Sequence, residues 1–136
     1  MNRYTALIDG QAGAYGIVFP DLPGCAAMGK TIEAAIANAG AAMRDWAEVT
    51  LEMGGVLPNP RALEELRQDA DVVAALAEGS TLASVPMIRD SGKPAKANLS
   101  LDAGLLAAID AEATRRKLTR SAFVEMMARR SLLEMA

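Results

Sequence analysis

The stretch Ala95-Lys96-Ala97-Asn98-Leu99-Ser100-Leu101 decides how the second half of this chain folds. Apolar and polar residues alternate along it, so an extended backbone would turn the apolar side chains to one face and the polar ones to the other. The pattern predicts a short strand with one buried face and one solvent-exposed face. Its apolar face would hold Ala97, Leu99 and Leu101, and its polar face Lys96, Asn98 and Ser100.

Two helical patterns follow this strand without room for another. The first begins near Asp102, which is a good N-cap residue type, and the second begins at Thr119. Because a lone strand and two short helices are marginal in water, we expect a second copy of the chain to pair with the first across a two-fold axis. The predicted dimer core consists of Ala97, Leu99, Leu101, Leu105, Ile109, Phe123 and Met127.

The strand-helix-helix order resembles a ribbon-helix-helix DNA-binding domain. The resemblance implies a two-stranded ribbon that enters the DNA major groove, and a second helix whose N-terminus holds a phosphate. The alternative left open is an edge strand and helical hairpin used only for dimerisation. The implied base contacts are Lys96, Asn98 and Ser100, and the implied phosphate contacts are Thr119, Arg120 and Ser121.

The overall charge of −3 hides an asymmetry between the two halves of the 136 residues. Six Lys or Arg residues stand against twelve Asp or Glu residues through Asp90, which gives −6, and eight stand against five from Ser91 onward, which gives +3. An excess of positive charge favours binding to phosphate, and an acidic surface favours a basic protein. Together with the patternless stretch 89–94, this predicts a domain boundary between residues 1–90 and 91–136.

The first half begins with strand and turn signals. Strands are expected at 3–9, 15–19 and 25–28, with the rigid loop 20–25 between the last two. Thr31 is expected to cap a long helix that ends at Gly54. This helix is expected to pack on the sheet, and the alternative that it forms a dimer interface with a second copy is left open. Its expected apolar stripe is Ile32, Ile36, Ala39, Met43, Trp46 and Met53.

The run Phe19-Pro20-Asp21-Leu22-Pro23-Gly24-Cys25, followed by 29–35 and 38–39, resembles the N-terminal domain of HicB-family antitoxins. Lys30 departs from the acidic residue usual in that family. The resemblance implies an α+β fold, with a small antiparallel sheet and a long helix like a degenerate ribonuclease H, ahead of the ribbon-helix-helix dimerisation domain. It also implies a partner, a HicA-like toxin that cleaves messenger RNA.

A second helical pattern links the first sheet to one more strand. Asn59 and Pro60 are expected to begin this helix, which runs to Gly79 with an interruption near 69–71. The strand at 81–88 is expected to return to the sheet at an edge, which Pro86 favours.

Several classes of protein are excluded or disfavoured by composition. The chain has no histidine and one cysteine, so His-dependent nucleophile arrangements, zinc sites and internal disulfides are excluded. No apolar run suits a membrane span and no signal-peptide pattern is present, so a cytoplasmic protein is expected. No cofactor, metal or catalytic residue is predicted. A nuclease would need the carboxylates Asp9, Asp21, Glu33 and Asp45 to converge.

Three hypotheses follow. The leading one is an antitoxin that neutralises its toxin through 1–90 and represses its own operon by binding operator DNA through 91–136 as a homodimer, with a tetramer through the N-terminal halves left open. The second is a stand-alone ribbon-helix-helix transcriptional regulator whose N-terminal domain oligomerises or senses a ligand. The third is the nuclease.

Overall fold

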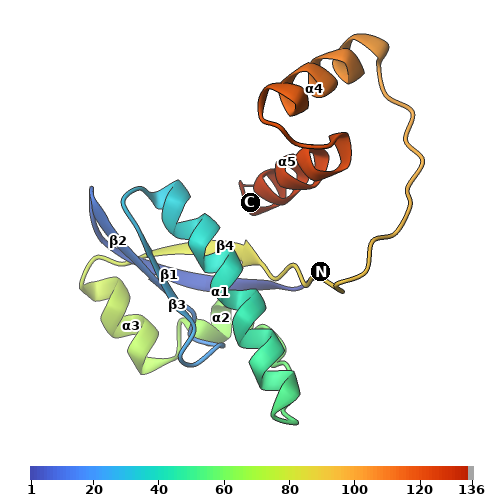
Figure 1. The fold of residues 1–136 in the computed structure, drawn as a ribbon. Helices are drawn as coiled ribbons and strands as arrows, with labels where there is room; N and C mark the ends of the chain where they lie inside the picture. The colour runs from blue at the N-terminus through green and yellow to red at the C-terminus, as the bar shows by residue number, and fades with distance from the viewer. Residues whose placement is uncertain (135–136) are drawn as a thin grey trace. The chain divides into compact units, whose positions relative to one another are not determined.

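The computed structural model describes residues 1–134, which fold into two compact units. Unit 1 is Met1–Asp90 and unit 2 begins at Ser91 (Figure 1). Unit 1 contains all four strands and three helices, and unit 2 contains the two remaining helices of the described chain.

Unit 1 is built on an antiparallel sheet of four strands in the order β3-β2-β1-β4. The strands are β1 (Arg3–Gln11), β2 (Ala14–Val18), β3 (Ala26–Gly29) and β4 (Thr81–Pro86). The short β1–β2 turn leaves Gln11 opposite Ala14, and β4 returns beside β1 with Arg3 opposite Pro86. The predicted hairpin and third strand are confirmed. Pro86 lies at the end of an edge strand, where its missing N–H costs no ladder hydrogen bond, as expected.

Helix α1 (Ile32–Glu52) begins as predicted at Thr31, whose hydroxyl accepts a hydrogen bond from the Ala34 N–H at 3.0 Å. The predicted apolar stripe is only partly right, because Ile32 is 41% and Met53 83% exposed. The reason is the small distance between α1 and the sheet: a Cβ on Gly29 would lie 2.3 Å from the Ala35 nitrogen. Small residues therefore fill most of the contact, and the buried positions are Ala35, Ala39, Gly40, Met43 and Ala47.

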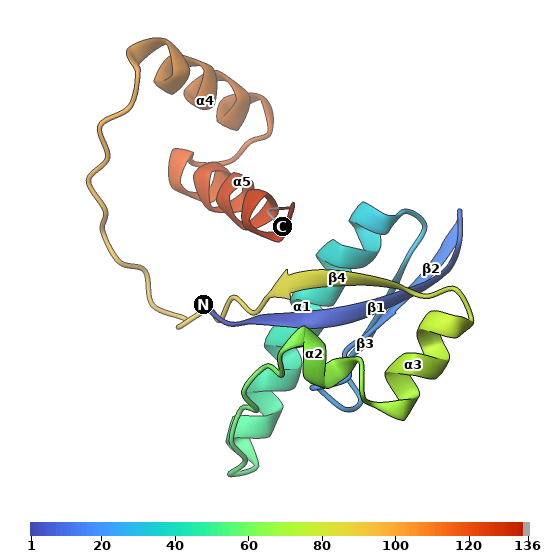
Figure 2. The same ribbon diagram turned by 180° about the vertical axis from the view of Figure 1, so that it is seen from behind.

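The opposite side of the sheet carries α2 (Leu63–Leu66) and α3 (Ala70–Ala77), as Figure 2 shows from behind. The predicted helix start at Asn59 and Pro60 is wrong, because residues 53–62 have no regular structure and α2 begins after Ala62. The predicted interruption is confirmed, since Asp69 caps α3 through the Asp71 N–H. Leu66 and Val72 from these two helices pack with Leu7 of β1, with Ala75, Leu76 and Leu82 around them.

Unit 2 is a helical hairpin of α4 (Ala103–Arg115) and α5 (Arg120–Glu134). Asp102 caps α4, as predicted, by accepting the Leu105 N–H at 3.0 Å. Helix α4 ends with Lys117 at φ +58°, and the Leu118 N–H returns to the Ala113 carbonyl, which is a Schellman termination with lysine where glycine is usual.

In the single chain the segment 95–101 is not a hydrogen-bonded strand, and its predicted pairing with a second copy of the chain stays a prediction. All seven of its residues are exposed, and the chain runs here as an extended connection without secondary structure (Figure 1). A strand requires a neighbour for its backbone N–H and C=O groups, and none of the strands of the described chain pairs with this segment.

Candidate functional site

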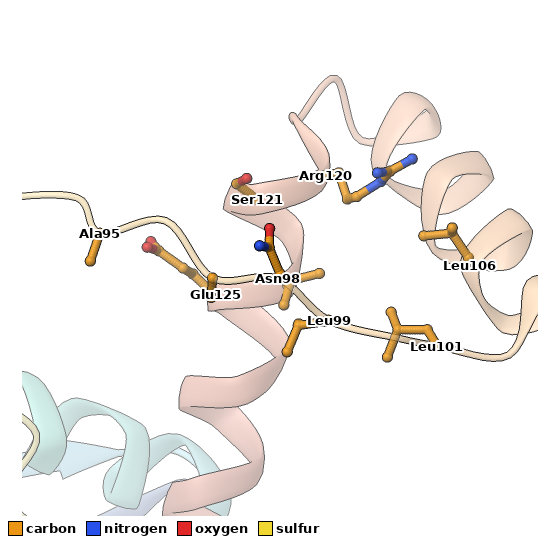
Figure 3. Close-up of a pocket in the computed structure, with 10 residues that line it drawn as sticks. Ala95, Asn98, Leu99, Leu101, Leu106, Arg120, Ser121 and Glu125 are labelled. Carbon is orange, nitrogen blue, oxygen red and sulfur yellow. The ribbon is translucent and has the colours of Figure 1, made fainter.

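The exposed segment 95–101 forms one wall of a groove in unit 2. The groove has a volume of about 480 Å³, and its other walls come from α4 and the first turns of α5. In Figure 3, Asn98 and Leu99 point to opposite sides of the segment, as the alternation predicts for an extended backbone. The groove brings together a predicted base contact and two predicted phosphate contacts, since Asn98 lines it together with Arg120 and Ser121. The full lining is Ala95, Ala97, Asn98, Leu99, Leu101, Leu106, Arg120, Ser121, Val124 and Glu125.

The predicted base-contact residues Lys96, Asn98 and Ser100 are all exposed in the single chain. Their side chains are therefore accessible to a ligand, and no part of the helical hairpin buries them. Lys96 makes no ion pair within residues 1–134.

The predicted dimer core divides into two groups in the single chain. Ile109 and Phe123 are buried with Ala113 and form the hairpin's own core. The other five members are exposed, with values of 67% for Leu99, 54% for Leu105 and 42% for Leu101. Each hairpin thus buries Ile109 and Phe123 by itself, and their place in a core between two chains stays a prediction. The members left uncovered are Ala97, Leu99, Leu101, Leu105 and Met127.

The start of α5 has the local structure expected of a helix N-terminus. The Thr119 hydroxyl accepts a hydrogen bond from the Ala122 N–H at 3.1 Å, which is an N-cap interaction. The hydroxyl of Thr119 is thus already engaged in the helix. Ser121 lies one residue into α5 and is exposed.

Arg120 has a partner that sequence reasoning missed. Its Nε and Nη2 donate to the two carboxylate oxygens of Asp110 at 2.7 and 2.8 Å, a bidentate pair between α5 and α4. The hydrogen bonds from Arg120 hold the pKa of Asp110 below its ordinary value. A phosphate at Arg120 would therefore compete with an internal carboxylate. The partners lie ten positions apart in the sequence and only the helical hairpin brings them together, so no local signal predicts the pair.

A second acidic residue, Glu112, pairs with the two arginines at the end of α4. Glu112 accepts hydrogen bonds from Arg115 and, at 2.8 Å, from Arg116 Nε, and these bonds lower the pKa of Glu112 to about 2. Arg116 also lies over the Phe123 ring, with its guanidinium carbon 5.4 Å from the ring centre. Much of the positive charge of unit 2 is thus engaged within the hairpin. The three lysines of this unit, Lys93, Lys96 and Lys117, make no ion pairs among the described residues.

In unit 1 the rigid loop 20–25 is held by side chains that are distant in sequence. Arg61 Nε donates to Asp21 at 2.6 Å, and Arg61 Nη1 donates to Asp69 at 3.1 Å. The Trp46 indole N–H donates to the Pro23 carbonyl at 2.9 Å. A hydrogen bond from a backbone N–H of α3 and one from Arg61 lower the pKa of Asp69. Asp21 therefore fixes the loop to the segment before α2.

The other carboxylates considered for a nuclease do not converge. Asp9 is exposed on β1, while Glu33 and Asp45 are exposed on α1. Within residues 1–134, no three His, Cys, Asp or Glu side chains are grouped so as to hold a metal ion. Cys25 is buried, and burial raises the pKa of its thiol. None of the described helices has both the length and the apolar character needed to cross a membrane.

Comparisons with known proteins agree over nearly the whole chain. A family model described as "HicB_like antitoxin of bacterial toxin-antitoxin system" matches residues 4–128. The crystal structure of the Burkholderia pseudomallei antitoxin HicB is similar, with 29% identity and a TM-score of 0.55 over 97% of this chain and 99% of that one. The crystal structure of antitoxin HicB3 has 27% identity and a TM-score of 0.54 over 96% and 97%. A chain of the HicA3 and HicB3 toxin-antitoxin complex has 26% identity and a TM-score of 0.52 over 65% and 98%. Comparison with curated protein sequences gave no match.

Proposed function

The chain belongs to the family of HicB-like antitoxins of bacterial toxin-antitoxin systems, and from this premise we propose that it neutralises a HicA-like ribonuclease toxin and represses its own operon. The observation that carries the toxin part is the family match over residues 4–128, together with a similar chain in a HicA3 and HicB3 complex. Neutralisation is by direct binding of unit 1, which masks the RNA-binding surface of the toxin. The protein itself is a non-enzymatic regulator, located in the cytoplasm with the messenger RNA that such a toxin cleaves.

The acidic balance of unit 1 supports this assignment. Its twelve Asp or Glu residues against six Lys or Arg residues favour a basic partner such as a ribonuclease. The antiparallel sheet with one long helix is also compatible with a degenerate ribonuclease-H-like fold.

Unit 2 dimerises through the segment 95–101 and binds operator DNA as a ribbon-helix-helix domain. Support comes from the exposure of Leu99, Leu101 and Leu105 in the single chain, since a protein gains stability by burying such residues in a partner. Antiparallel pairing of two segments would satisfy their backbone groups and present two polar faces to the major groove. The base contacts in this proposal are Lys96, Asn98 and Ser100, and the phosphate contacts are Thr119, Arg120 and Ser121.

One experiment tests both parts of the proposal. The tagged chain is purified from its native host with and without nuclease treatment, and the bound proteins and DNA are identified. We expect a small basic ribonuclease that remains bound after nuclease treatment, and DNA from the promoter of the same operon. Recovery of operator DNA without any toxin would favour the stand-alone transcriptional regulator, in which unit 1 oligomerises or senses a ligand.

The DNA part has a sharper test in Asn98→Ala. Loss of one amide contact to a base edge should weaken binding to the cognate site by about 1 to 3 kcal/mol, and should relax the preference at one base pair. Binding is measured by fluorescence anisotropy with operator and scrambled duplexes. Unchanged operator affinity for Asn98→Ala would show that the segment is not the reading element.

A further inference from the structure

One half of a sheet face in unit 1 has no helix on it. Cross-strand pairs place Val18 beside Ala26 and Gly16 beside Met28, and residues paired in this way point to the same face. The intervening Ala27 and Gly29 point to the other face, which α1 covers, since a Cβ on Gly29 would contact α1. Val18, Ala26 and Met28 therefore lie on the face opposite α1.

Helices α2 and α3 cover this face only over β1 and β4. Their buried side chains Leu66 and Val72 pack on Leu7 of β1. Over β2 and β3, Val18 remains 49% and Met28 68% exposed. We name the residues Val18, Ala26 and Met28 the open strand face.

The open strand face also carries a carboxylate. Asp9 is paired with Gly16 across β1 and β2, and its Oδ1 would lie 2.7 Å from a Cβ at Gly16, so the carboxylate lies over β2 on this face. Asp9 is exposed and makes no hydrogen bond or ion pair through its side chain within residues 1–134. An apolar strip beside a free carboxylate is complementary to an apolar side chain beside an arginine or lysine.

The outer edge of β3 is partly blocked. The Asn38 side-chain amide donates to the Met28 carbonyl at 2.7 Å, so this edge acceptor already has a partner. An added strand would have to displace Asn38. A partner is therefore expected to dock on the face through side chains.

Two partners could cover the open strand face, a basic protein or a second copy of unit 1, and the charge of unit 1 favours the basic protein. A symmetric contact at this face would bring together two units of balance −6, each with an unpaired Asp9. A basic partner would instead be attracted by the same negative charges. We infer that the open strand face, with Asp9, receives the basic toxin: Val18 and Met28 contact its apolar side chains and Asp9 pairs with one of its arginines or lysines. This inference rests on the proposed function of unit 1.

The test compares the full-length chain with variants in binding to a catalytically inactive form of the toxin, measured by calorimetry at two salt concentrations. Met28→Lys places a positive charge on the surface that faces the basic toxin, and the two repel each other. The substitution should weaken binding by roughly 30-fold or more, as for a central interface residue. Asp9→Asn should weaken it by roughly threefold to tenfold and reduce its salt dependence.

The matched controls are Met53→Lys and Val56→Lys, which make the same kind of change at residues 83% and 86% exposed, away from this face. Both should bind like the unchanged chain. Trp46 fluorescence and circular dichroism check that every variant is folded.

Each outcome separates the inference from the proposed function. If the unchanged chain binds the toxin and Met28→Lys binds equally well, the docking surface is wrong and the antitoxin role stands. A change of oligomeric state by Met28→Lys with unaltered toxin affinity would assign the face to a second copy and overturn the inference. If the unchanged chain does not bind the toxin at all, the proposed function itself fails.

Discussion

Replacement of Gly29 by alanine should be among the most damaging single-methyl changes in unit 1. The added Cβ would lie 2.3 Å from the Ala35 nitrogen and 2.7 Å from its Cα, whereas ordinary van der Waals separations begin near 3.4 Å. Both obstructing atoms belong to the backbone of α1, so no side-chain rotation relieves the clash. The helix must move away from β3 by roughly 1 Å, which loosens the packing of Ala35 and Ala39 on the sheet.

The cost follows from this displacement. Overpacking that shifts backbone costs about 1 to 3 kcal/mol, and the weaker dispersion attraction between α1 and the sheet places Gly29→Ala at the upper end, about 3 kcal/mol. For a unit of this size, that destabilisation lowers Tm by roughly 10 °C or more. The reporter is Trp46, the single tryptophan, which lies on α1 and bonds to the Pro23 carbonyl. Its fluorescence is followed through urea unfolding of the full chain.

The matched control is Gly16→Ala, the same change on the neighbouring strand. Its Cβ would meet Asp9 Oδ1 at 2.7 Å, but this atom is the end of a flexible, exposed side chain that can rotate away. The free energy of unfolding should change by less than about 1 kcal/mol, since alanine also restricts the unfolded chain. Equal urea midpoints for Gly29→Ala and the unchanged chain would refute the close seating of α1 on β3.

Three further predictions concern unit 2. Lys117→Gly should stabilise the hairpin by about 0.5 to 1 kcal/mol in thermal unfolding, because glycine adopts φ +58° without strain; a loss of stability would contradict the Schellman termination. Asp110→Asn should release Arg120 and raise the affinity for every DNA sequence, with a steeper salt dependence in anisotropy titrations; unchanged non-specific binding would show that the pair does not compete with phosphate. The ion pairs that lower the pKa of Glu112 contribute stability that is fully present above about pH 4.5 and is lost as the pH falls toward about 2. In a circular dichroism titration, the unchanged chain should therefore lose helicity over this pH range, and Glu112→Gln should lack this loss. Identical acid titration curves for the two chains would show that the ion pairs of Glu112 do not stabilise the helix.

Local signals in the sequence were sufficient for most of the elements. Thr31 and Asp102 each place a side-chain oxygen on a backbone N–H three residues ahead, so the starts of α1 and α4 could be predicted. The order of the first three strands could be predicted because the connections between them are short. The failure at Asn59 and Pro60 is also local, since these residues suit a helix start as well as the extended stretch that they form.

Only the tertiary structure decided which side of α1 is buried, which residues hold the loop 20–25, and which half of the sheet face stays open. The sequence placed large apolar residues such as Ile32 in the core, but the short distance between α1 and the sheet admits mainly alanine and glycine there. Arg61 meets Asp21 across forty residues, and Arg120 meets Asp110 across ten. Periodicity reports how one element distributes its side chains around its own axis. Burial and pairing depend on the distance to other elements, which is a property of the folded chain.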